Sequence, residues 1–129
     1  MIETMLTKTV PYLPLEIFDI RWGNGELQLR GTGWNFIALS AWRLSFENRV
    51  LFGCYDSDVQ EEIEIIKGLQ IIRIECQEKL LKIYPVFILS NGQRIEIFST
   101  RTVKPLTLEI EKLGVFLGGQ NEPDESLVI

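Results

Sequence analysis

Apolar and polar residues alternate along most of this chain, and a repeat of two is typical of β-strands with one buried and one exposed face. Leu27 and Leu29 alternate with polar neighbours, as do Leu106, Leu108 and Ile110. The strands that this pattern predicts lie at residues 15–22, 26–30, 34–38, 42–46, 50–52, 70–77, 84–89, 93–99 and 106–111. The chain is therefore predicted to form mostly antiparallel sheet, with turns between neighbouring strands.

One predicted hairpin has the clearest sequence signal. Asn91 and Gly92 stand between two runs rich in apolar and β-branched residues. An Asn-Gly pair in that position favours a type I′ turn, in which both residues have positive φ. Val86 to Leu89 is continuously apolar rather than alternating, which predicts a central strand covered on both faces.

A single helix is predicted at residues 57–67. Ser57 followed by Gln60 matches a capping box, and Gly68 stands where a C-terminal glycine cap is expected. The apolar residues that recur at helical spacing are Val59, Ile63 and Ile66. The predicted fold class is α+β: a twisted, mainly antiparallel sheet of roughly seven to nine strands, barrel-like or rolled, with one inserted α-helix.

Length and composition fit one globular domain, because the chain has 129 residues, of which 46% are hydrophobic and 24% charged. Residues 1–113 are predicted to form this domain, and residues 114–129 a flexible acidic C-terminal tail. No apolar run reaches the roughly 20 residues of a membrane-spanning helix. The N-terminus lacks the charged start and apolar centre of a signal peptide. We therefore expect a cytoplasmic protein without a membrane partner.

The chain contains no histidine, the side chain on which most general-base and metal sites depend. Glycine-rich nucleotide-binding motifs are also absent. Cys54 and Cys76 lack C-x-x-C spacing and are expected to be buried, reduced thiols. Two alternatives stay open: oxygen ligands for a cation around residues 56–58, and a pair of carboxylates from distant strands, such as Glu75 and Glu96. No catalytic residue, cofactor or metal site is predicted.

The formal net charge of −5 is concentrated in two acidic blocks, one in the tail and one at the start of the predicted helix. The helical block has no basic residue until Lys67, so it presents carboxylates on a solvated face that a basic protein partner could bind. Trp22, beside Arg21 and a glycine turn, is expected to be the most exposed tryptophan. The predicted partner-binding residues are Asp58, Glu61, Glu62, Glu64 and Trp22. Scattered basic residues and overall acidity argue against a nucleic-acid partner.

The remaining signal is a set of segments: Trp42-Arg43-Leu44-Ser45, residues 53–56, residues 87–99 and Pro105-Leu106-Thr107-Leu108. Together they resemble a loose class of small bacterial proteins of unknown function, some of which are similar to immunity proteins of bacterial toxin systems. The resemblance carries no catalytic motif and concerns the fold more than the function. We therefore expect a non-enzymatic, immunity-like protein-binding module. The alternatives are a small-ligand pocket in a curved sheet and a homo-oligomeric structural module that pairs exposed strand edges.

Overall fold

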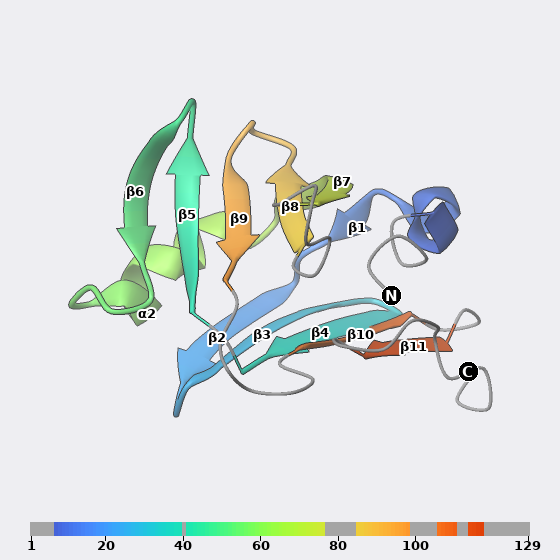
Figure 1. Cartoon of the computed structure of the whole chain (residues 1–129), viewed down its shortest axis with the longest axis horizontal. Helices are drawn as coiled ribbons and strands as arrows, with labels where there is room; N and C mark the ends of the chain where they lie inside the picture. The colour runs from blue at the N-terminus through green and yellow to red at the C-terminus, as the bar shows by residue number, and fades with distance from the viewer. Residues whose placement is uncertain (1–6, 40, 77–84, 99–105, 111–113, 118–129) are drawn as a thin grey trace.

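The computed structural model describes residues 7–39, 41–76, 85–98, 106–110 and 114–117, and these form two antiparallel sheets (Figure 1). The six-stranded sheet has the order β1-β7-β8-β9-β5-β6. Its strands are β1 (Leu15–Glu16), β5 (Trp42–Phe46), β6 (Arg49–Gly53), β7 (Gln70–Cys76), β8 (Pro85–Leu89) and β9 (Arg94–Ile97). Every residue of β8 is buried, as the continuously apolar sequence predicts.

The five-stranded sheet has the order β11-β10-β4-β3-β2. Its strands are β2 (Asp19–Gly23), β3 (Glu26–Gly31), β4 (Trp34–Ala38), β10 (Leu106–Ile110) and β11 (Gly114–Leu117). The segment at residues 15–22, predicted as one strand, is instead shared between the sheets, because Leu15 pairs with Ile71 while Asp19 pairs with Arg30. A strand that changes sheets at a bend is one way to form the corner of a two-sheet protein.

The two sheets pack their apolar faces together, with strands that run crosswise to each other (Figure 1). Phe36 of β4 contacts Phe87 of β8 edge to face, with ring centroids 4.8 Å apart. Trp22 of β2 meets Trp42 of β5 in the same manner at 5.8 Å. The antiparallel prediction is confirmed, but the expectation of one rolled or barrel-like sheet is corrected, since both sheets are open within the described residues. Alternation identifies the buried face of each strand and leaves its partners undetermined.

The predicted type I′ turn at Asn91 and Gly92 is wrong, although the hairpin between β8 and β9 forms. Only Gly92 has positive φ, at 89°. The amide of Gly92 donates to the Leu89 carbonyl at 2.9 Å, and Asn91 Oδ1 accepts from the amide of Gln93 at 3.0 Å, which together give a three-residue loop. Two-residue loops with positive φ at both positions join β2 to β3 and β5 to β6. Their residues are Asn24 with Gly25 and Glu47 with Asn48.

The predicted helix is present but shorter than expected. It consists of α2 (Val59–Ile63) continued by the 3₁₀ turn η2 (Glu64–Ile66). A second 3₁₀ turn, η1, covers Val10–Tyr12. Ser57 and Gln60 do not form the predicted capping box, because Asp58 occupies the N-cap with φ of 60° and makes no capping bond. Gly68 follows the helix with φ of 87°, as a C-terminal glycine should.

The sheet extends into the segment predicted as a tail. β11 pairs with β10 in register Thr107 to Leu117 and Ile110 to Gly114, so the tail boundary at residue 114 is corrected. Residues 118–129, with the acidic block expected there, lie outside the described residues. Cys54 is buried, as predicted, and forms no disulfide within the described residues, whereas the side chain of Cys76 lies outside the described part. No helix in the described ranges is both long and apolar enough to cross a membrane.

Candidate functional site

The structure divides the predicted partner-binding residues between two neighbouring surfaces. Trp22 and Glu64 line a groove between β2 and α2, whereas Asp58, Glu61 and Glu62 are exposed on the solvent side of α2. Trp22 is half-buried while the other two tryptophans are buried, so its predicted rank as the most exposed tryptophan is confirmed.

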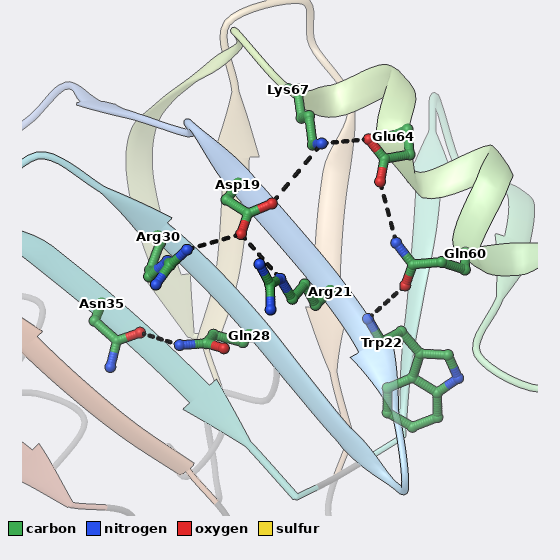
Figure 2. Close-up of polar contacts among 9 residues, drawn as sticks. All are labelled: Asp19, Arg21, Trp22, Gln28, Arg30, Asn35, Gln60, Glu64 and Lys67. Atoms are coloured by element: carbon green, nitrogen blue, oxygen red, sulfur yellow. Dashed lines mark hydrogen bonds and ion pairs between the residues drawn. The ribbon is translucent and has the colours of Figure 1, made fainter.

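Gln60 holds the helix against the edge of the five-stranded sheet (Figure 2). Its Oε1 accepts a hydrogen bond from the backbone amide of Trp22 at 2.7 Å, and its Nε2 donates to Glu64 Oε1 at 3.2 Å. Glu64 in turn forms an ion pair with Lys67. Since β2 is an edge strand, this side chain occupies a backbone donor that would otherwise be open to another strand.

Asp19 is the centre of a charged cluster on the same groove (Figure 2). Its carboxylate accepts from Arg21 Nε at 3.1 Å and from Arg30 Nη2 at 3.0 Å, and lies 3.8 Å from Lys67 Nζ. Desolvation raises the pKa of Asp19, but the charge of Arg21, the hydrogen bond and charge of Arg30, and the charge of Lys67 together lower it below 3.8. The pKa of Lys67 is raised, chiefly by its hydrogen bond to Glu64.

The groove has a volume of about 590 Å³, but its charged groups are committed to one another. Among its described lining residues, Glu26 is the one charged side chain without an ion pair, and no nucleophile with an adjacent base is present. Nor does any group of three or more acidic or cysteine side chains in the described ranges have the arrangement of a metal site. The groove is therefore best described as a polar contact between sheet and helix, in which most charged side chains pair with one another.

The outer side of α2 and the turn before it form a different surface. Tyr55 is 87% exposed and Ile65 is 60% exposed. Glu61 and Glu62 are exposed, and neither carboxylate has an ion pair or side-chain hydrogen bond in the described part of the chain. We call five of the exposed residues of this segment, Tyr55, Asp58, Glu61, Glu62 and Ile65, the α2 face. Ile65 was not among the residues predicted from the sequence. The available signal is that this isoleucine falls outside the helical spacing of the buried residues Val59, Ile63 and Ile66.

The alternative of paired catalytic carboxylates is not supported by the positions of Glu75 and Glu96. Val86 stands between them in the strand register. Each carboxylate contacts an arginine instead, Glu96 with Arg43 at 2.9 Å and Glu75 with Arg73 at 3.5 Å. The two groups therefore do not share a site.

The chain matches none of the protein-family models, curated proteins or solved structures with which we compared it. The candidate site consequently stands on its own geometry.

Proposed function

We propose that this protein is a non-enzymatic binding module, of an immunity-like kind, that recognises a basic protein partner through the α2 face. The observation that carries the proposal is the exposure of Ile65 close in the helix to Glu61 and Glu62, whose charges are unpaired within the described residues, together with the exposure of Tyr55 in the turn that leads into the helix. Large exposed apolar groups supply contact area, and tyrosine is enriched among interface residues that dominate affinity.

Charge complementarity indicates the chemistry of the partner. Asp58, Glu61 and Glu62 carry negative charge that α2 does not neutralise internally, and the whole chain has a net charge of −5. Such a surface attracts a basic partner and repels acidic ones, so it favours rapid and selective association. The neighbouring groove is less suited to this role, because Asp19 and Glu64 already hold cations from the same chain.

Self-association through strand edges is the weaker alternative. Gln60 occupies an outward amide of β2, and β6 contains an irregularity where Leu51 is left out of the pairing with β5. Bulges and occupied edges both hinder the addition of another strand.

The test begins with isolation of the partner that co-purifies with the protein from its native host. The affinity of this partner is then measured for the wild-type protein and for variants. We expect the double variant Glu61→Lys/Glu62→Lys to bind about ten- to hundredfold more weakly at low salt, and the difference to shrink as salt screens the charges. The matched control is Glu16→Lys/Glu47→Lys, which makes the same change of charge at exposed positions away from α2.

Equal weakening in the two double variants would mean that net charge rather than the α2 face governs binding. Tyr55→Ala tests the apolar part of the same surface and should cost at least tenfold in affinity, about 1.4 kcal/mol, if Tyr55 is an anchor. An unchanged affinity in both Glu61→Lys/Glu62→Lys and Tyr55→Ala would overturn the proposal.

A further inference from the structure

The outer face of the six-stranded sheet carries a row of polar residues opposite the core. Ile95 and Ile97 of β9 point into the core, so Arg94 and Glu96 lie on the other side. The register places Arg94 between Ile88 of β8 and Ser45 of β5. Arg94 therefore stands at the boundary between an apolar strand and a polar one.

Most of the polar groups on this face are already paired. Arg43 donates to both oxygens of Glu96, at 2.9 and 3.4 Å, and the Ser45 hydroxyl donates to Glu96 Oε1 at 2.8 Å. The Glu96 side chain is only 12% exposed, and Arg43 also lies over the ring of Phe98 at 4.7 Å. Hydrogen bonds therefore hold these three side chains together, and the positive charge of Arg43 balances the negative charge of Glu96.

Arg94 is the exception. Its charge helps to lower the pKa of Glu96, yet it forms no ion pair in the described part of the chain. Its buried Nε has no hydrogen-bond partner among the residues that the structure describes. A buried donor without a partner is uncommon in folded proteins and calls for a physical explanation, and the binding of a water or an ion is one such explanation. A guanidinium left in this state is suited to an oxyanion, which it can bind through two parallel hydrogen bonds.

Two adjoining cavities meet at Arg94 and Asn48. The smaller, of about 170 Å³, is lined by the polar triad together with Arg94, Asn48 and Val50. The larger, of about 460 Å³, includes Ile72 and Ile88 in its wall. Together they fall within the size range of small-molecule sites, which commonly combine an apolar body with a few convergent polar groups.

We propose that this face binds a small organic anion, with its carboxylate or phosphate head at Arg94 and Asn48 and its apolar body against Ile72, which is 41% exposed, beside the largely buried Ile88. The site is separate from the α2 face and goes beyond the proposed function. Three carboxylates line the cavities, and two of them, Glu75 and Glu96, are neutralised by arginines. Glu47 is the lining carboxylate without such a partner, and it opposes an anion.

The test is a titration of the ¹⁵N-labelled full chain, followed by NMR, with acetate, hexanoate, inorganic phosphate and hexyl phosphate. We expect saturable shifts at the amides of Asn48, Gly92 and Arg94, with hexanoate binding at least tenfold more tightly than acetate because four further methylenes lose contact with water. The ranking of hexanoate against hexyl phosphate identifies the head group. Failure of every probe to saturate, or shifts centred on the β2–α2 groove, would overturn the site. Equal affinities for acetate and hexanoate would overturn the apolar part.

Variants then test the residues. Arg94→Gln should weaken binding about ten- to hundredfold, because it removes a charge-assisted hydrogen bond. Asn48→Gly removes the amide while keeping a residue suited to φ of 64°, so it should weaken binding without unfolding the turn. Glu47→Gln should tighten binding by about twofold. Arg21→Gln, in the other groove, is the control and should have no effect. Unchanged affinity in both Arg94→Gln and Asn48→Gly would refute the site, whereas Glu61→Lys/Glu62→Lys should leave anion binding intact.

Discussion

Replacing Gly31 with alanine should destabilise the fold far more than an ordinary strand substitution. Gly31 ends β3, directly beneath the hydrogen bond that Trp34 Nε1 donates to the Glu16 carbonyl at 3.0 Å. A Cβ at Gly31 would overlap both partners of this bond, the indole nitrogen and the backbone oxygen. The oxygen belongs to β1, so relief of the overlap requires the corner between the two sheets to move.

The expected cost follows from two contributions. Overpacking a buried site costs about 1–3 kcal/mol, and losing the Trp34 hydrogen bond adds about 0.5–1.5 kcal/mol. The free energy of unfolding of Gly31→Ala should therefore fall by about 1.5–4.5 kcal/mol, which urea denaturation followed by tryptophan fluorescence would measure. The matched control is Gly23→Ala at the end of β2, where a Cβ would meet nothing within 4 Å. That change should be neutral or stabilise the protein by about 0.4–1 kcal/mol.

A double variant locates the origin of the effect. Trp34→Phe removes the indole nitrogen and with it one of the two overlaps, so it should recover part of the loss in the Gly31→Ala background. The carbonyl of Glu16 remains, so the recovery should be incomplete. If Gly31→Ala changes the unfolding free energy by less than about 0.5 kcal/mol, as surface substitutions usually do, the described corner geometry is wrong.

Three further substitutions test other contacts. Glu96→Gln should cost about 1–3 kcal/mol at neutral pH. Desolvation raises the pKa of Glu96, but its hydrogen bonds and nearby arginines together lower this pKa below 4.5. The stability of the wild-type protein should therefore fall as the pH drops below 4.5. Denaturation measured across pH should show a flatter stability profile for Glu96→Gln. Gly92→Ala should destabilise the protein more than Gly68→Ala in thermal melts. Both glycines have φ near 90°, but only at Gly92 would the new Cβ press on Phe46, at 3.0 Å. Equal losses of stability in the two variants would contradict this contact. Gln60→Ala should cost about 1 kcal/mol and speed amide exchange at the β2 edge, and unchanged exchange there would remove Gln60 as the edge cap.

Strand positions could be predicted because side-chain alternation is local, and most observed strands fall close to the predicted runs; β11, in the segment predicted as a tail, is the exception among the described strands. The division into two sheets could not be predicted, since the alternation at residues 15–22 is compatible with either one strand or two. What separates β1 from β2 is their pairing with Ile71 and Arg30, and those partners are distant in sequence. The turn at Gly92 differs from the predicted type because the side chain of Asn91 bonds to a backbone amide, which stabilises a longer loop.

The candidate site was predicted only in part. Exposure of Asp58, Glu61 and Glu62 follows from helical periodicity, which is a local property. The role of Gln60 was misassigned, because its partner is an amide of β2 that lies 38 residues earlier in the sequence. Nothing in the sequence indicates that Asp19 gathers three cations, since Arg21, Arg30 and Lys67 meet only after the sheet and helix pack.

The arrangement of strands has a consequence for the order of folding. β2, β3 and β4 are consecutive neighbours joined by two-residue loops, whereas the pairing of β5 with β9 brings together residues 53 positions apart. Closing a long loop costs more chain entropy than closing a short one. We therefore expect the β2–β4 meander to be formed in the transition state, so that substitutions there slow folding, whereas Glu96→Gln mainly accelerates unfolding. The opposite partition in stopped-flow kinetics would show that the long-range pairing forms first.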